Sequence, residues 1–273
     1  MSMLSKSKSK IHILTSANYP KGNEDLRALC GAVRERGVEC GFLLWGESGV
    51  REGDMLLALG VWDYAKDYKK FLTWLEEMQT LGARIFNPLL TIKNNIDKRY
   101  LLELEQRGIP IVPSEFVESR DLAKRDLAGK VIKPPVGQSG VGVERGERVE
   151  LLAYPLGAIV QPFIPSIQER GEVCLVFFGG EFRYSILRKP KEWRANSSYG
   201  VSVSAITPQK EWIELGERAL EGVEYLYARV DIFIEPLLVS EVELIEPALY
   251  FFAHQGAMQE FVGRLIQRFV QKC

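Results

Sequence analysis

The chain has 273 residues, of which 46% are hydrophobic and 26% charged, as expected for a globular protein of one or two domains. Its formal net charge of -1 argues against nucleic-acid or membrane-surface binding, and no apolar run approaches the roughly 18 residues of a membrane span. Four cysteines without C-x-x-C spacing and two distant histidines argue against a zinc site or a disulfide framework and favour a reducing, cytoplasmic location.

The N-terminal part of the chain predicts an α/β domain. Residues 1–10 are rich in serine and lysine and precede only a short apolar run, so we expect a flexible tail rather than a signal peptide. A strand at 11–14, a helix that Asn23 opens and Gly37 ends, and a strand at 38–45 follow. This order predicts a βαβ unit with a parallel sheet.

Two further strands, at residues 55–59 and 85–88, flank an amphipathic helix at 69–81. The aromatic loop at 60–64 follows a strand end, where α/β sheets usually bind ligands. The other interpretation is a loop that packs its own aromatic side chains, and we favour that one.

From residue 92 the pattern changes to shorter elements. Helices are predicted at 100–106 and 121–127, with an extended stretch at 109–113 between them. The apolar pair at 131–132 then reads as the end of a strand.

A lysine and a glycine-rich loop follow that strand end. Lys133 is succeeded by Gly137, Gln138, Ser139, Gly140 and Gly142. Glycines let a backbone approach a charged ligand, successive N–H groups make a concavity for anions, and a lysine adds a point charge for phosphate. The pattern is neither a P-loop, because the lysine precedes the glycines, nor a dinucleotide fingerprint, because no helix pattern follows. A plain hairpin turn is the alternative.

The second half of the chain predicts antiparallel pairing. A strand at 156–163 contains Pro162, which argues for an edge strand or a linker. Residues 172–178 and 181–187 flank two glycines, which is typical of a β-hairpin. The remaining predicted elements are a basic loop at 189–200, a helix at 212–221, strands at 228–234 and 239–245, and a core-facing helix at 255–270.

An acidic cluster lies near the C-terminus. Asp231 stands in an apolar strand, and Glu241, Glu243 and Glu246 follow it. Glu241 and Glu243 share a face because side chains alternate along a strand, and Asp231 joins that face if the two strands pair. Such hard oxygen ligands beside a phosphate site would hold Mg²⁺. A solvent-exposed edge strand is the alternative, but the preceding lysine–glycine stretch favours the metal site.

The order of these motifs resembles that of the ATP-grasp enzymes, most of all bacterial glutathione synthetase and the ribosomal-protein S6 glutamate ligases. The resemblance extends from about residue 87 to 248. Its motifs are Asp97-Lys98, Lys133-Pro134 with the glycine loop, Gln161–Pro165, Gly171-Glu172, Arg188-Lys189-Pro190, Arg194-Ala195-Asn196, Arg229-Val230-Asp231, and Glu241-Val242-Glu243 with Pro247.

The resemblance implies an α/β (α+β) ATP-grasp fold. A pre-ATP-grasp domain would occupy residues 1–90, a small lid subdomain 91–160, and a C-terminal catalytic subdomain with an antiparallel sheet 161–273. The chain also resembles a smaller group found near natural-product genes, which includes the D-cycloserine-forming cyclo-ligase. The aromatic residues at 62–64 and 71–74 carry that second likeness.

The resemblance also implies a role for each motif. Two lysines contact ATP phosphates beneath a mobile glycine lid, a hinge binds adenine, and an acidic residue binds ribose. The implied nucleotide-binding residues are Lys98, Lys133, Gly137, Gln138, Ser139, Gly140, Gln161, Pro162, Phe163, Ile164 and Glu172. The implied metal ligands are Asp231, Glu241 and Glu243, for Mg²⁺ with Mn²⁺ as the alternative; the catalytic arginines are Arg188, Arg194 and Arg229; and Asn196 is a substrate residue.

Three departures from glutathione synthetase argue against glutathione as the product. Glu243 replaces the usual asparagine and adds a negative charge. Cys174 replaces an arginine, and the loop from Arg188 to Arg194 is shorter.

The function that the resemblance implies is an ATP- and Mg²⁺-dependent carboxylate–amine ligase, which forms an amide through an acyl phosphate on a small amino-acid or peptide-like substrate. Such chemistry needs positioning and charge neutralisation rather than a protein nucleophile. An intramolecular cyclo-ligase and a non-catalytic ATP-binding protein are the alternatives. The expected partners are ATP and small carboxylate and amine substrates, with neither nucleic acid nor membrane; a homo-oligomer is compatible with the sequence.

Overall fold

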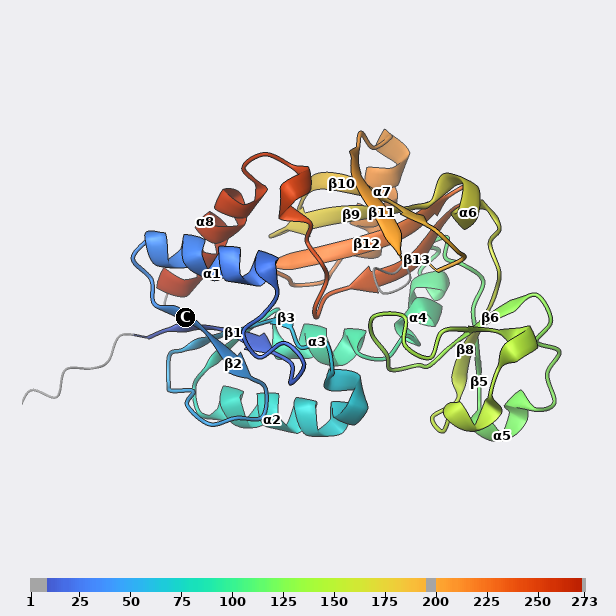
Figure 1. The fold of residues 1–273 in the computed structure, drawn as a ribbon, viewed down its shortest axis with the longest axis horizontal. Coiled ribbons are helices and arrows are strands. Elements are labelled where there is room, and N and C mark those ends of the chain that lie inside the picture. The colour runs from blue at the N-terminus through green and yellow to red at the C-terminus, as the bar shows by residue number, and fades with distance from the viewer. Residues whose placement is uncertain (1–8, 195–199, 272–273) are drawn as a thin grey trace, which may run out of the picture. The chain divides into compact units, whose positions relative to one another are not determined.

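The computed structural model describes residues 9–194 and 200–271, which fall into two units (Figure 1). One unit consists of the chain up to Leu90 together with the residues from Tyr250 onward, and the other is Thr91–Leu249.

The N-terminal unit contains the predicted parallel sheet. Its strands run in the order β2-β1-β3-β4, and every neighbouring pair is parallel, which confirms the βαβ prediction. The Asn23 side chain accepts a hydrogen bond from the Leu26 N–H and so opens the first helix as expected. The elements are β1 (Ile11–Thr15), α1 (Glu24–Glu35), β2 (Cys40–Leu44), β3 (Met55–Gly60), the 3₁₀ turn Tyr64–Asp67, α2 (Tyr68–Thr80) and β4 (Arg84–Phe86).

The last helix, α8 (Ala257–Val270), belongs to this unit, although the sequence placed it in the C-terminal subdomain. Its buried face includes Phe261 and Leu265, and the helix contacts α1. The Arg84 guanidinium donates to the carbonyl oxygens of Arg268, Phe269 and Gln271, which the end of a helix leaves without partners. These contacts join residues that are far apart in the sequence, which is why the sequence alone did not place α8 in the N-terminal unit.

The second unit is built on an antiparallel sheet of order β11-β10-β9-β12-β13. The hairpin predicted at the two glycines is confirmed, with Phe178 opposite Glu181. Helices α4 and α7 bury Leu101, Leu104, Trp212 and Leu215 in one core with the apolar side chains of the sheet. The elements are α3 (Leu89–Asn95), α4 (Tyr100–Gln106), α6 (Ser166–Arg170), β9 (Glu172–Phe178), β10 (Glu181–Pro190), β11 (Val201–Ile206), α7 (Lys210–Ala219), β12 (Tyr227–Ile234) and β13 (Leu237–Glu243). The 3₁₀ turn Phe251–Ala253, which comes later in the chain, belongs to the N-terminal unit.

A smaller antiparallel sheet of order β5-β8-β6-β7 carries the lysine–glycine stretch. The glycine loop joins β6 to β7, so it is the connection of a hairpin. The edge-strand expectation for Pro162 is wrong, because β8 lies between β5 and β6; the proline is tolerated as the last residue of its strand. The elements are β5 (Glu115–Val117), α5 (Ser119–Leu122), β6 (Lys130–Lys133), β7 (Glu144–Arg145), the 3₁₀ turns Gly146–Arg148 and Leu151–Ala153, and β8 (Ala158–Pro162).

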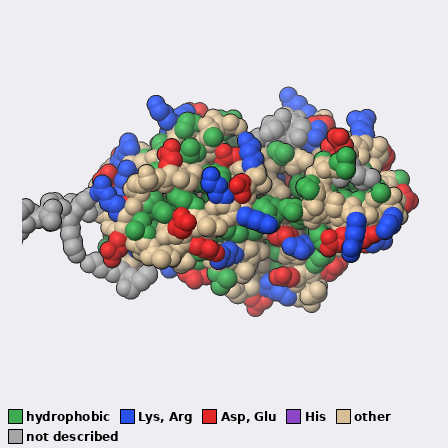
Figure 2. Space-filling view, turned by 90° about the horizontal axis from the view of Figure 1, so that it is seen from below, with side chains coloured by type: hydrophobic (Ala, Val, Ile, Leu, Met, Phe, Trp, Pro, Cys, Tyr) green, Lys and Arg blue, Asp and Glu red, His purple; other side chains and the backbone are tan. Residues whose placement is uncertain are grey.

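Figure 2 shows acidic and basic side chains interspersed on the face in view, which agrees with the near-zero net charge of the chain. In the part of the chain that the structure describes, none of the helices has the length and apolar character needed to span a bilayer.

Candidate active site

The acidic cluster is assembled by the pairing of β12 with β13. Asp231 lies opposite Glu241, and Arg229 lies opposite Glu243, which confirms that Asp231 joins the face of the two glutamates. The register shifts just beyond Asp231, because Ile232 pairs with Val239 and Ser240 is left as an extra residue. Such a bulge redirects side chains and is common beside active sites.

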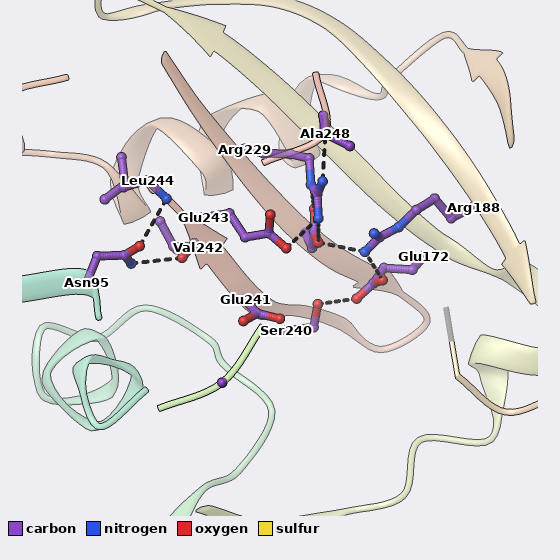
Figure 3. A network of polar contacts seen from close by, with 12 residues as sticks. Asn95, Glu172, Arg188, Arg229, Ser240, Glu241, Val242, Glu243, Leu244 and Ala248 are labelled. Carbon is purple, nitrogen blue, oxygen red and sulfur yellow. Dashed lines mark hydrogen bonds and ion pairs between the residues drawn. The ribbon is translucent and has the colours of Figure 1, made fainter. Parts of the chain in front are cut away.

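β13 is the edge of its sheet, yet its outer side is covered. The Asn95 side chain donates to the Val242 carbonyl and accepts from the Leu244 N–H, as Figure 3 shows. The Tyr100 hydroxyl exchanges hydrogen bonds with both backbone groups of Val242. These contacts fix the strand that carries Glu241 and Glu243, and no motif in the sequence indicated them.

Two arginines hold the buried carboxylates together (Figure 3). Arg188 donates to Glu172 and to Asp231, at 2.6 Å in each case. Arg229 donates to the two oxygens of Asp231, at 2.8 and 2.9 Å, and to Glu243. Asp231 is fully buried, so its charge depends on these partners. Four neighbouring strands are thereby linked through their charged side chains.

Burial and pairing together shift the pKa values of these carboxyl groups. Burial alone would raise the pKa of Asp231, but Arg188 and Arg229 outweigh it and lower the pKa to about 2. Burial raises the pKa of Glu243 to about 7 despite the Arg229 guanidinium.

Glu246 is the carboxylate of the cluster that has neither a hydrogen bond nor an ion pair to another side chain in the described residues. Burial, with the nearby Glu243 charge, raises its pKa to about 8. A carboxyl group with a pKa of about 8 changes its charge in the physiological pH range.

Lys98 connects β13 to the glycine loop. Its Nζ lies 2.8 Å from Glu241 Oε1 and donates to the Gly137 carbonyl at 2.8 Å, while its backbone N–H donates to the Pro135 carbonyl at 2.7 Å. Burial opposes its charge, but Glu241, together with Glu243 and Glu246, outweighs burial and raises the pKa of Lys98.

Lys133 has no ion-pair partner among the described residues, unlike Lys98. It stands opposite Ile159 at the end of β6, where the glycine loop begins. Burial lowers the pKa of Lys133, because the charged ammonium lacks a direct counter-charge. An anionic ligand would supply that charge.

The glycine loop adopts conformations that suit its sequence. Gly140 and Gly142 have positive φ angles of 69° and 72°, where a β-carbon would be strained. The Tyr154 hydroxyl donates to the Gly142 carbonyl at 2.6 Å and anchors the end of the loop. Lys98 holds its beginning through Gly137.

The predicted adenine hinge, residues 161–164, begins with the last two residues of β8 and continues beyond it. Gln161 is buried and donates to the Ser114 hydroxyl at 2.8 Å. The Phe163 ring lies under the Arg145 guanidinium, 4.1 Å from its centroid, and contacts Trp193 edge-on. Neither Arg145 nor Trp193 was singled out from the sequence, since each lies outside the motifs.

The other predicted site residues have different surroundings. Glu172 accepts hydrogen bonds from Arg188 and from the Ser240 hydroxyl, so its carboxylate belongs to the charged cluster in this structure. Arg194 donates to Glu192 at 2.9 Å and lies over the Trp193 ring. Asn196 lies outside the described residues. The roles assigned to these residues stay predictions.

The predicted metal ligands have the right chemistry, since all are hard oxygen donors. In this structure, however, Lys98 pairs with Glu241, and Arg229 pairs with Asp231 and Glu243. Across the described ranges, no group of three acidic, histidine or cysteine side chains is arranged to hold a metal ion. A metal role for these carboxylates therefore requires that their cations take other partners.

Replacing Arg229 with leucine is expected to lower the free energy of unfolding by about 3–5 kcal/mol, because Asp231 and Glu243 lose a buried partner. The measurement is urea denaturation at neutral pH. Arg183→Leu is the control, since Arg183 pairs with the exposed Glu181 and such pairs contribute about 0–1 kcal/mol. Equal losses in the two variants would contradict the account of the cluster.

Glu246→Gln is expected to flatten the pH dependence of stability. The folded-state pKa of about 8 exceeds the ordinary value of 4.5, so the folded protein retains this proton longer than the unfolded chain. The contribution of Glu246 to the free energy of unfolding is therefore fully present below pH 4.5. It is lost as the pH rises toward 8, by ~1.4 kcal/mol for each unit by which the two pKa values differ. Thermal or urea unfolding between these pH values measures it, and the exposed Glu221→Gln serves as control. A profile unchanged by Glu246→Gln would contradict the assignment.

Comparison with known proteins finds similarity in sequence and in structure. A family model for the N-terminal domain of the D-cycloserine synthetase DcsG matches residues 11–87. The cycloserine biosynthesis protein DcsG of Streptomyces lavendulae is 28% identical over 184 residues, which cover 59% of this chain and 61% of that protein. The match thus spans less than two thirds of the curated relative.

Solved structures show the same fold over nearly the whole chain. The crystal structure of D-cycloserine synthetase DcsG has a TM-score of 0.81 at 23% identity and covers 96% of this chain and 100% of that one. D-alanine–D-alanine ligase from Bacillus anthracis complexed with ATP has a TM-score of 0.66 at 14% identity, with 97% and 96% covered. The ATP-grasp ligase PsnB complexed with minimal precursor, Mg and ADP has a TM-score of 0.59 at 15% identity, with 97% and 99% covered. The resemblance read from the motifs is confirmed at the level of the fold: the chain has the ATP-grasp fold, and its sequence is similar to that of the cycloserine biosynthesis protein DcsG.

Proposed function

We propose that the chain is an ATP- and Mg²⁺-dependent ligase that joins a carboxylate to an amine through an acyl phosphate. The observation that carries this proposal is Lys133, a partly buried cation without an ion pair in the described residues, at the base of a glycine loop. Such a cation is best satisfied by a phosphate group. The fold is shared with a ligase complexed with ATP and with a ligase complexed with Mg and ADP, which supports the same ligand.

A triphosphate also offers new partners to the other cations of the cluster. Lys98 now pairs with Glu241, and Arg229 with Asp231 and Glu243. If phosphate oxygens take over these cations, the carboxylates become available as ligands for Mg²⁺. The bound ion would neutralise charge on the phosphates. When phosphate replaces a carboxylate as the partner of a cation, and Mg²⁺ replaces that cation as the partner of the carboxylate, no buried charge is left without a counter-charge.

The remaining roles follow from the reaction. A substrate carboxylate oxygen attacks the γ-phosphorus of ATP, ADP leaves, and an amine nitrogen then attacks the acyl carbon and releases phosphate. Arg188 and Arg229 would stabilise the charge that moves during phosphoryl transfer. The glycine loop would exclude water, which would otherwise hydrolyse the acyl phosphate.

A ring-forming reaction is the second candidate, in which the amine belongs to the same molecule as the carboxylate. The match of residues 11–87 to the N-terminal domain of D-cycloserine synthetase favours it. The chemical steps and the roles of the lysines are the same in both reactions, so the product distinguishes them.

Lys133→Ala is expected to weaken ATP binding about tenfold or more, because the phosphates lose a charged hydrogen-bond donor. Isothermal titration calorimetry with ATP and Mg²⁺ measures the dissociation constant. Lys130→Ala is the matched control, since Lys130 lies on the same strand and side chains three residues apart on a strand point to opposite faces. If both variants bound ATP like the wild type, the phosphate site would be elsewhere.

The proposed activity is tested by ADP release from the purified protein with small amino-acid and carboxylate–amine pairs. We expect release in the presence of Mg²⁺, loss of release in EDTA, and recovery when Mg²⁺ is returned in excess. Mass spectrometry of a positive reaction separates an intermolecular amide from a ring. Full turnover in EDTA would contradict the carboxylate roles, and tight ATP binding without ADP release from any pair would contradict the ligase proposal.

A further inference from the structure

Two buried cysteines of the N-terminal unit contact each other through their thiol groups. Cys30 lies on α1 and Cys40 is the first residue of β2, and each is free and only 2% exposed. The Cys40 thiol is hydrogen-bonded to the sulfur of Cys30. The packing of α1 against the strand that follows it brings the two sulfurs together. Their spacing in the sequence is not that of a C-x-x-C motif, so the pair became apparent only in the folded chain.

Two positive charges lie close to this pair. Arg34 follows Cys30 by about one turn of α1, and its Nε donates to the Cys40 carbonyl at 2.9 Å. The Lys10 side chain lies against the next residue of β2, because a β-carbon on Gly41 would be 2.9 Å from the Lys10 Cε. The hydrogen bond from Cys40, together with these cations, outweighs burial and lowers the pKa of Cys30 to about 7. About half of the Cys30 side chains are therefore thiolates at neutral pH, and the thiolate is the reactive form of cysteine.

Cys40 has the complementary character. The hydrogen bond to Cys30 and burial both raise the pKa of Cys40, so this thiol keeps its proton. In redox-sensing proteins, a thiol of low pKa reacts with the oxidant and a neighbouring thiol then resolves the product. A buried cysteine that only fills space needs neither a second thiol nor nearby cations. The two cysteines therefore have the chemistry of an attacking thiol and a resolving thiol.

The position of the pair in the fold gives a small oxidant a route to it. β2 is an edge strand, which pairs only with β1 within its sheet. The connection from α1 to β2 is exposed at residues 34–37 and at Glu39. Segments with few buried contacts open locally at a small cost in free energy, well below that of global unfolding. A molecule as small as hydrogen peroxide can thus reach the thiols without unfolding of the unit.

We propose that Cys30 and Cys40 form a redox-modification site, which a peroxide oxidises to an intramolecular disulfide. Disulfides of this kind in a reducing compartment are usually transient, and a thiol reductant restores the two thiols. The proposal concerns the N-terminal unit alone and does not depend on the proposed ligase reaction.

The reaction has two steps. The Cys30 thiolate attacks one oxygen of hydrogen peroxide, which breaks the O–O bond, leaves a sulfenic acid on Cys30 and releases hydroxide. The Cys40 sulfur then attacks the Cys30 sulfur, the S–O bond breaks, and the hydroxide leaves as water with the Cys40 proton. The proton that Cys30 lost neutralises the first hydroxide. Two thiols and one peroxide thus give one disulfide and two waters, and the two electrons from the thiols reduce the peroxide.

The test is peptide mass spectrometry of the reduced, folded protein after treatment with hydrogen peroxide at neutral pH. Cys273→Ser serves as the parent, because Cys273 lies outside the described residues and its replacement removes a thiol that could join two copies of the chain. We expect a peptide pair linked through Cys30 and Cys40, which dithiothreitol separates. Cys174 is the internal control, since burial raises the pKa of its thiol. It should react at least about tenfold more slowly than Cys30.

Two variants of the parent separate the steps. Cys40→Ser keeps a hydrogen-bond donor beside Cys30 but removes the second thiol, so oxidation should stop at the sulfenic acid, which dimedone traps. Cys30→Ser should leave Cys40 reduced, because burial still opposes its thiolate. The oxidised parent should also unfold at a higher temperature than the reduced parent, since the bond restricts the unfolded chain. Peroxide should produce no such shift in Cys30→Ser.

The linked peptide is measured in the parent, so the main result does not depend on the folding of either variant. A parallel sample in urea shows how the thiols react in the unfolded chain. Formation of the disulfide only in urea, equal oxidation of Cys30 and Cys174, or oxidation of Cys40 in Cys30→Ser would overturn the proposal.

Discussion

The Asp231 carboxylate lies between two guanidinium groups, and the arrangement of the candidate active site depends on this contact. Arg188 and Arg229 reach it from two other positions in the sheet and extend the pairing to Glu172 and Glu243. Buried ion pairs contribute little net stability, because desolvation opposes their attraction, whereas loss of one partner is costly. A cluster of this kind therefore tolerates the exchange of partners far better than their removal, which suits the binding of a charged ligand.

The two lysines beside this cluster differ in a way that suggests separate tasks. Lys98 is paired with Glu241 and also holds the Gly137 carbonyl, so it couples the carboxylate strand to the glycine loop. Lys133 has no such pair among the described residues, and burial lowers its pKa. A phosphate could satisfy Lys133 without breaking a contact, whereas engaging Lys98 would change the contacts of both the loop and β13.

Lys133 is a partly buried cation in the larger unit, and none of the described carboxylates forms an ion pair with it. Uncompensated buried charge is expensive, so its presence in a folded protein is a physical reason to look for a ligand of opposite sign. A nucleotide phosphate is the ligand that the position of Lys133 favours.

Local sequence patterns were enough to predict the parallel and antiparallel regions, the hairpin glycines and the shared face of Asp231 and Glu241, because alternation and turn chemistry act over a few residues. The cations that pair with those carboxylates, the bulge at Ser240 and the place of α8 in the N-terminal unit became apparent only in the folded chain. These features depend on contacts between residues far apart in the sequence. No local pattern encodes such partners, so the arginine pairing was not visible before the strands were placed side by side.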